Sequence, residues 1–123
     1  MASLEIYARE CPSAAVNDWL ADTFGKVECV STEPALTFEF VYETETIRVF
    51  VAEGIEGGPY TSIWFNGPVL PWKKARFCAR DAHQFLDVEV ICDRDGPEQD
   101  PWAMLRFVDG DRTAVDQRDL PDF

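Results

Sequence analysis

The first half of the chain alternates between strand-like and helix-like patterns of apolar residues. Residues 4–10 carry Leu, Ile and Ala at every second position, which is typical of a half-buried strand. Residues 12–24 repeat apolar side chains at helical spacing, and Pro12 and Gly25 suit the two ends of a helix. Three strands are then predicted, the last two as a hairpin, at residues 27–31, 36–43 and 46–53.

The second half repeats this order after a glycine-rich linker at residues 54–59. A strand is predicted at residues 60–66, and Pro71 is expected to open a helix that runs to about Leu86. Asp109-Gly110 is a strong hairpin-turn signal between the last two strands. The three strands after the helix are predicted at residues 87–93, 102–108 and 112–117.

These elements predict an α+β fold in which two helices pack on a mostly antiparallel sheet. The 123 residues fit a single domain, with a polar tail that is expected to be frayed except at Leu120 and Phe123. Its predicted parts are module 1 (about residues 3–53), the linker, module 2 (about 60–117) and the tail (118–123). The likeness of KVECVS to DVEVICD, with Cys29 and Cys92 at matching places, indicates either a duplication or a chance resemblance.

The net charge limits the classes of molecule that this protein is expected to bind. The chain has 11 Lys and Arg against 23 Asp and Glu, a formal charge of −12. Nucleic acid and anionic membranes are therefore not expected partners, because both require a basic footprint. The sequence shows no apolar run long enough to span a membrane and no signal-peptide pattern, so we expect a cytoplasmic protein. An acidic surface serves either solubility or the docking of a basic partner.

Cysteine and histidine chemistry points to structure rather than catalysis. The four cysteines form no CxxC pair, so we expect reduced, mostly buried thiols. The only histidine, His83, lies about 140° around the predicted helix from Cys78, too far to share a metal. It is expected to be a satisfied side chain at the edge of the core. The acidic loop at residues 94–101 lacks calcium-loop spacing. We expect no metal, no cofactor and no catalytic residue.

The stretch WKKARFCARDAH, residues 72–83, gathers four of the eleven cations. On a helix its core side would consist of Trp72, Ala75, Cys78, Ala79, Ala82, Phe85 and Leu86. The opposite side, a predicted contact surface, consists of Lys73, Arg76, Phe77 and Arg80. Phe77 is expected to point away from the core, under another segment or against a partner. The cations would meet acidic groups from the protein's own loops or from a second subunit.

Six aromatic residues on the predicted strands are candidates for a ligand cleft. They would supply its walls if they face a common cavity, and plain core packing is the alternative. The six are Tyr7, Phe38, Phe40, Tyr42, Trp64 and Trp102.

The paired strand-helix-strand-strand-strand order over residues 4–117 resembles the glyoxalase and bleomycin-resistance superfamily, in topology alone. Enzymes of that superfamily place His and Glu metal ligands on sheet strands, whereas residues 4–10 and 60–66 contain no histidine. The resemblance therefore implies a metal-free binding branch, with an aromatic-lined cleft in a dimer. The chain also looks like small acidic orphan α+β proteins of bacterial mobile gene cassettes, a likeness that implies no activity.

The sequence thus predicts a non-enzymatic cytoplasmic binding protein that acts as a homodimer. Its partner would be a second copy, another protein or a small molecule. Three alternatives stay open: a metal-free protein that sequesters a small molecule, an immunity-type acidic inhibitor of a basic protein, and an enzyme of unrecognised class.

Overall fold

The computed structural model describes residues 2–94 and 102–120 of the chain. The first half contains β1 (Ala2–Arg9), α1 (Ser13–Phe24), β2 (Glu28–Ser31), β3 (Leu36–Tyr42) and β4 (Glu45–Ala52). The second half contains β5 (Tyr60–Gly67), α2 (Ala75–Leu86), β6 (Val90–Asp93), β7 (Ala103–Val108) and β8 (Asp111–Asp116). Single 3-10 turns lie at Ile55–Gly57 (η1) and Gln117–Asp119 (η2).

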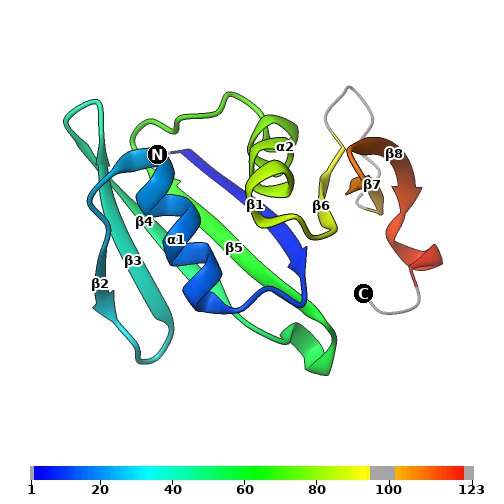
Figure 1. The fold of residues 1–123 in the computed structure, drawn as a ribbon, viewed down its shortest axis with the longest axis horizontal. Helices are drawn as coiled ribbons and strands as arrows, with labels where there is room; N and C mark the ends of the chain where they lie inside the picture. Colours follow the sequence, from blue (N-terminus) through cyan, green and yellow to red (C-terminus); the bar gives the residue numbers. More distant parts are fainter. Residues whose placement is uncertain (1, 95–101, 121–123) are drawn as a thin grey trace.

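All eight strands belong to one antiparallel sheet, in the order β2-β3-β4-β5-β1-β6-β7-β8. Both helices pack on the same face of this sheet, side by side (Figure 1). The predicted α+β class is therefore confirmed. The main core fills the space between the helices and the sheet, and its largest fully buried side chains include Trp19, Leu20, Ile47, Ile63 and Phe65.

The two halves repeat the order of elements but not the pairing of strands. In the first half β4 lies next to the central strand β5, and β2 forms the edge of the sheet. In the second half β6, which occupies the place of β2 in the chain order, lies next to the central strand β1, and β8 forms the edge. The two halves therefore share the order of their elements along the chain but not the order of their strands in the sheet.

Both predicted hairpins are confirmed. β3 pairs with β4 across a two-residue turn in which Glu43 and Thr44 both have positive φ, at 50° and 67°. β7 pairs with β8 across Asp109 and Gly110, with φ at 51° and 82°. Two successive positive φ values define the turn whose twist matches that of the flanking strands, which explains the tight register on both sides.

The predicted start of the second helix is wrong. α2 begins at Ala75 and not at Pro71, and Lys74 at its N-cap is extended, with φ −141° and ψ 149°. The reason is Trp72, which is buried but precedes the helix. Its ring stacks on Trp19 with centroids 5.8 Å apart, and the extended backbone after Pro71 lets it reach that place. The predicted end at Leu86 is confirmed.

Two smaller expectations change, and the one for Leu120 is confirmed. The strand expected from residue 87 begins at Val90, because Asp87 takes a left-handed conformation, with φ 55°, at the end of α2. Phe85, expected in the core, is 43% exposed. In the tail, Leu120 packs against the small cluster of Tyr60, Ile91 and Met104. Phe123 and most of the acidic loop, residues 95–101, lie outside the described residues.

Candidate functional site

An aromatic cluster at the end of α1 reaches the surface of the protein. Phe24 occupies the last position of α1, just before the stop at Gly25. Its ring stacks on Phe40 of β3 with centroids 4.1 Å apart, and meets Tyr42 and Trp72 edge-on at 6.3 and 5.7 Å. Because Phe24 and Tyr42 are only partly buried, the cluster presents aromatic surface to any molecule that lies against it.

A groove between the two helices borders this cluster and is the strongest candidate site. This interhelical groove has a volume of about 450 Å³, within the usual range of small-molecule pockets. Its aromatic walls are Phe24, Tyr42, Trp72 and Phe77. Its charged groups are Lys73, Arg80 and Asp81. The site therefore combines an apolar floor with polar groups at its rim.

Asp81 organises the polar side of the interhelical groove. Its carboxylate accepts a hydrogen bond of 2.8 Å from the indole N–H of Trp72, which fixes the buried ring. Its other oxygen lies 3.6 Å from Nε of Arg80, in a pair whose two side chains are about half exposed. An exposed pair of this length stabilises the fold by roughly 0–1 kcal/mol. Arg80 therefore keeps donors available toward the groove.

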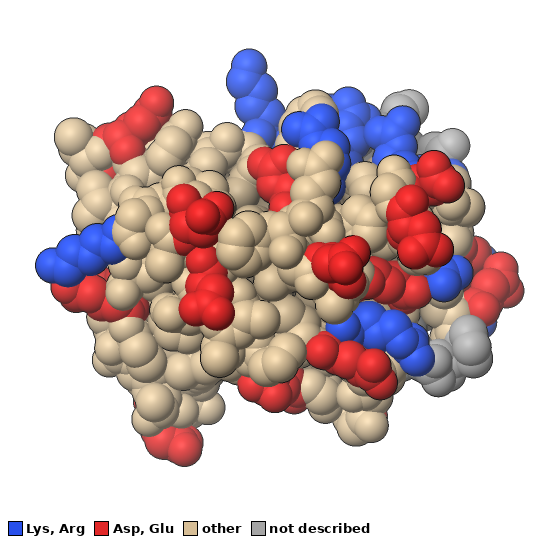
Figure 2. Space-filling view, in the orientation of Figure 1, with Lys and Arg blue, Asp and Glu red and all other residues tan. Residues whose placement is uncertain are grey.

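The cations of this region stand out on an acidic protein. Lys and Arg gather along the upper edge of the molecule, over α2, while acids are scattered over the rest of that face (Figure 2). Within the described residues, Arg80 has Asp81 nearby, but Lys73, Lys74 and Arg76 have no carboxylate within 4.0 Å. The described loops thus do not supply the acids that the sequence led us to expect around these three cations.

Phe77 does not point away from the core, so that expectation is wrong. The ring is partly buried and packs against the main core cluster. The guanidinium groups of Arg76 and Arg80 lie 5.0 and 5.5 Å from its centroid, within the range of a cation–π contact. The reason is that Phe24, Tyr42 and Trp72, which come from other elements, lie beside this flank of α2. Phe77 forms a wall of the interhelical groove instead of an isolated exposed ring.

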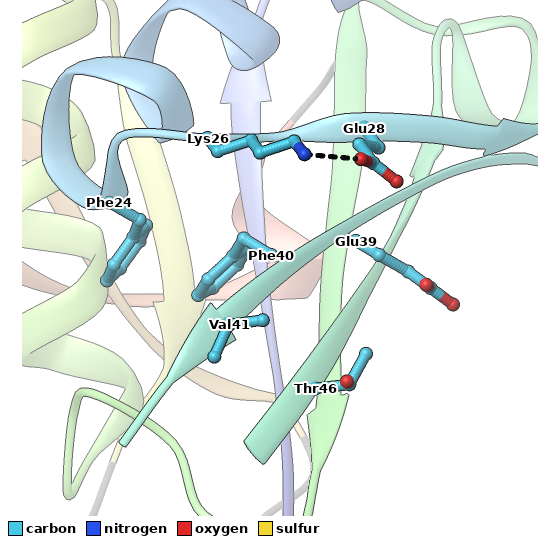
Figure 3. A pocket seen from close by; sticks show the side chains of 7 residues that line it. All are labelled: Phe24, Lys26, Glu28, Glu39, Phe40, Val41 and Thr46. Carbon is cyan, nitrogen blue, oxygen red and sulfur yellow. Dashed lines mark ion pairs between the residues drawn. The ribbon is translucent and has the colours of Figure 1, made fainter. Parts of the chain in front are cut away.

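A second hollow lies on the other side of Phe24, where β2 diverges from β3 (Figure 3). This edge pocket has a volume of about 430 Å³, and Phe24 and Phe40 form its apolar side. Lys26 and Glu28 form an ion pair of 3.2 Å across its upper rim. Because both of those side chains are mostly exposed, the pair defines no fixed binding geometry.

The structure does not bring the six candidate aromatic residues to one cavity. Phe38 and Phe40 are buried in the main core, under the helices. Tyr42 lines the interhelical groove. Tyr7 and Trp64 lie on the opposite face of the sheet, and Trp102, which is 42% exposed, has the guanidinium of Arg118 5.6 Å from its ring. Only Tyr42 and Phe40 border the hollows described above.

Tyrosine–glutamate hydrogen bonds order part of the sheet face opposite the helices. Tyr7 donates to Glu5 at 3.0 Å, and Tyr60 donates to Glu89, which also accepts from Arg106 at 2.8–3.0 Å. Burial raises the pKa of Tyr60 to about 12, and the Glu89 carboxylate adds to the shift. Burial and Glu5 likewise raise the pKa of Tyr7. Both phenols therefore stay protonated at neutral pH and act as structural donors.

His83 is a satisfied side chain at the edge of the core, as the sequence predicts. Its Nε2 accepts a hydrogen bond of 2.9 Å from the backbone N–H of Gly110. Its Nδ1 lies 2.8 Å from the carbonyl oxygen of Val88 and therefore carries the proton. The His83 imidazole connects α2 to the β7–β8 turn and has no nitrogen left for a substrate.

All four cysteines have free thiols, and three of them are buried.

Comparison of the chain with family models, with curated proteins and with solved structures finds no match. The resemblance to the glyoxalase and bleomycin-resistance superfamily therefore extends to the order of strands and helices and no further. Among the described residues, no helix is long and apolar enough to cross a membrane. The only support for the candidate site is therefore its geometry.

Three aromatic or charged residues of the groove, Phe24, Trp72 and Asp81, are not among the site residues expected from the sequence, which predicts Trp72 only as part of the core side of the helix. Phe24 looks like an ordinary core residue of an amphipathic helix, and Asp81 like a solvated acid. No local signal distinguishes Phe24, because its partners Phe40, Tyr42 and Trp72 come from other elements. No local signal distinguishes Asp81, since its partner Trp72 comes from outside the helix.

Proposed function

We propose that this chain is a binding protein that holds an anionic small molecule with a planar, apolar body in the interhelical groove. The observation that carries the proposal is the combination of four aromatic walls with two cations in one groove of about 450 Å³. Aromatic faces favour flat apolar groups, and the cations favour a carboxylate, sulfonate or phosphate on the same molecule.

Charge supports an anion as the polar part of the ligand. The chain as a whole is strongly acidic, and on the face shown in Figure 2 its Lys and Arg gather over α2, so an anion is favoured there. Lys73, Lys74, Arg76 and Arg80 lie within eight residues of one another, and Asp81 is the nearest acid in the sequence. The groove itself has two cations, Lys73 and Arg80, against one carboxylate, Asp81.

The experiment uses two fluorescent probes that share an aromatic body. One is 1-anilinonaphthalene-8-sulfonate, and the other is N-phenyl-1-naphthylamine, which lacks the sulfonate. We expect the sulfonate probe to bind natively folded protein at one site with a dissociation constant of about 1–100 µM. The neutral probe should bind about tenfold more weakly, which corresponds to ~1.4 kcal/mol. Equal affinity for both probes would contradict the proposal.

Variants place the probe in the groove. The double substitution Lys73→Ala and Arg80→Ala should weaken sulfonate binding about tenfold and leave the neutral probe unaffected. Lys26→Ala is the matched control, because Lys26 is an exposed cation of the edge pocket. Circular dichroism should show that all variants remain folded. Binding that survives the double substitution, or that Lys26→Ala reduces equally, would place the ligand elsewhere.

A further inference from the structure

Trp64 is exposed on the sheet face opposite the helices, and an acid lies beside it. Trp64 stands on β5 between Ile63 and Phe65, whose side chains belong to the core under the helices, so its own ring points away from them. Glu5 of β1 is its partner in the strand register, and directly opposed residues of an antiparallel pair have their side chains on one face. Trp64 is 42% exposed. The acid and the ring are therefore neighbours on an accessible surface.

Two hydroxyl groups hold the Glu5 carboxylate in place. Tyr7, two residues along β1, donates a hydrogen bond of 3.0 Å to one oxygen, and Ser62 of β5 donates to the other. A carboxylate has about four acceptor positions, so each oxygen keeps capacity for a further donor. Within residues 2–94 and 102–120, no Lys or Arg nitrogen lies within 4.0 Å of this carboxylate. The acid is thus positioned by the sheet without being paired to a cation there.

Phe50 extends the apolar surface on the other side of Trp64. It is the register partner of Trp64 on β4, and the centroids of the two rings are 5.3 Å apart. Phe50 lies between Val49 and Val51, which are core residues under the helices, so both rings share one face of the sheet. Phe50, Trp64 and Glu5 therefore form a row across the neighbouring strands β4, β5 and β1, which we call the ring–acid row.

Another part of the same protein shows which group fits an exposed indole beside an acid. Trp102 is also 42% exposed, and the guanidinium of Arg118 lies 5.6 Å from its ring centroid. The same guanidinium donates to both carboxylate oxygens of Asp116, at 3.0 and 2.7 Å. An arginine suits this place because its planar cation stacks on a ring while its N–H groups reach a carboxylate.

Trp64 has the neighbouring acid but no arginine. Among the described residues, no guanidinium lies over the Trp64 ring, whereas Trp102 and Phe77 each have at least one. Arg48 of the neighbouring strand β4 donates to Glu39 instead, at 2.8 Å. Residues 1, 95–101 and 121–123 of the sequence contain no Lys or Arg. An arginine beside Trp64 would therefore come from another molecule.

We infer that the ring–acid row is a docking site for a basic protein, which lays an arginine on Trp64 and pairs it with Glu5. The net charge of −12 favours the approach of a basic partner. Trp64 lines neither the interhelical groove nor the edge pocket, and an open strand face gives a free small molecule little enclosure. A protein that carries the arginine gains further contacts, with Phe50 above all. The inference does not depend on the interhelical groove, which lies on the helix face of the sheet.

Blocked tripeptides test the arginine contact on the wild-type chain. Each is acetyl-Gly-X-Gly-amide, with arginine, lysine or citrulline at X, and citrulline has the shape of arginine without its charge. The indole N–H signals of proton–nitrogen correlation spectra report each tryptophan, and Trp64→Leu assigns the signal of Trp64. The arginine peptide should shift that signal with a dissociation constant of about 1–10 mM. The lysine and citrulline peptides should bind at least about fivefold more weakly.

Trp102 and Glu45 provide matched controls. The Trp102 signal should move less than about a fifth as far as that of Trp64, because Arg118 already lies over the Trp102 ring. Glu5→Gln should weaken binding of the arginine peptide at least about fivefold. Glu45→Gln, which removes the same charge from an exposed residue at the start of β4, should leave it unchanged.

The comparison of peptides on the wild type holds even if Glu5→Gln fails to fold. Equal shifts at Trp64 and Trp102 would overturn the inference. Equal affinity for the arginine peptide and either comparison peptide would do the same, as would binding that a folded Glu5→Gln variant retains in full.

Discussion

β2 and β6 are alike in sequence and lie in opposite environments. β2 forms one edge of the sheet, its residues Glu28–Val30 are exposed, and its pairing with β3 is interrupted between Cys29 and Ser31. β6 pairs on both sides and also packs under α2, so Val90, Ile91 and Cys92 are fully buried. Cys29 and Cys92, which occupy matching places in the two halves of the sequence, are thus an exposed thiol and a buried thiol.

The difference shows that the position of a strand in the sheet determines its burial more than its own amino-acid sequence does. β2 is at the edge because β4 occupies the place beside β5 in the first half. β6 takes the corresponding inner place in the second half, beside β1. β6 is covered on both faces, by α2 and by the C-terminal segment, and VICD supplies apolar side chains for both in its first three residues, whereas ECVS has an acid and a hydroxyl at its ends.

The largest expected effect comes from placing the same charge in both strands. Cys92→Asp would bury a carboxylate without a partner, and a penalty of several kcal/mol should prevent stable folding. Cys29→Asp should change the free energy of unfolding by about 0.5 kcal/mol or less, because the site is exposed. Urea unfolding followed by circular dichroism measures both variants.

Thiol titration tests the same difference in burial between β2 and β6 without introducing a charged side chain. In native protein Cys29 should react rapidly with a thiol reagent, and Cys11, Cys78 and Cys92 should react slowly. Burial, with a contribution from Glu53, raises the pKa of Cys11 to about 11, which leaves very little thiolate at neutral pH. Similar destabilisation by the two aspartates, or four fast thiols in native protein, would show that the two strands share one environment.

The two halves also differ in the contact that joins the helix to the hairpin. Breaking this contact should have a smaller effect on the free energy of unfolding. In the first half the contact is aromatic, through Phe24 on Phe40. In the second half it is polar, through His83 to Gly110. His83→Ala should cost about 1–3 kcal/mol, since it leaves the Gly110 N–H and the Val88 carbonyl without their partner.

Gln84→Ala is the control for the His83 variant, because Gln84 is the neighbouring exposed residue of the same helix. It should change stability by about 0.5 kcal/mol or less. Faster amide exchange at Gly110 in His83→Ala, with Gln84→Ala unchanged, would localise the loss to the β7–β8 turn. Equal stability of the two variants would mean that the hydrogen bonds of His83 contribute nothing to joining α2 and the hairpin.

The smallest effect concerns the starts of the two helices. The backbone N–H and hydroxyl of Ser13 in α1 both donate to Glu53, at 2.8 and 2.6 Å, and these bonds lower the pKa of that carboxyl below its ordinary value of 4.5. Lys74, the N-cap residue of α2, makes no side-chain capping hydrogen bond. Lys74→Ser should therefore stabilise the protein by about 0.5–1 kcal/mol, and thermal unfolding would detect it.

Glu53→Gln should slightly lower the free energy of unfolding at neutral pH. Because the folded-state pKa of Glu53 is depressed, its contribution is complete above the unfolded-state pKa and is lost as pH falls through the folded-state value. The difference between wild type and variant should therefore shrink in acid. A difference that stays constant across the acid range would show that the carboxylate does not cap α1.

Much of the fold could be predicted because its signals are local. Alternation in β1, β3 and β4 follows from one buried and one open face, and Asp109-Gly110 takes positive φ readily. The errors have non-local causes. Pro71 suits a helix start, but the space beside Trp19 draws Trp72 inward and delays the helix to Ala75. The groove combines Phe24 with Trp72, residues about 50 positions apart, and no periodicity reports such a contact.

The sequence by itself determined the elements, their order and the acidic character of the protein, because these depend on side-chain spacing, turn residues and counts of charge. Only the tertiary structure decided that β4 and β6 lie inside while β2 and β8 form the edges. It also decided that Phe77 and Tyr42 meet at a groove while Trp64 faces the opposite side of the sheet. The physical reason is that strand order and interhelical packing minimise exposed apolar surface over the whole chain, and no local pattern contains that sum.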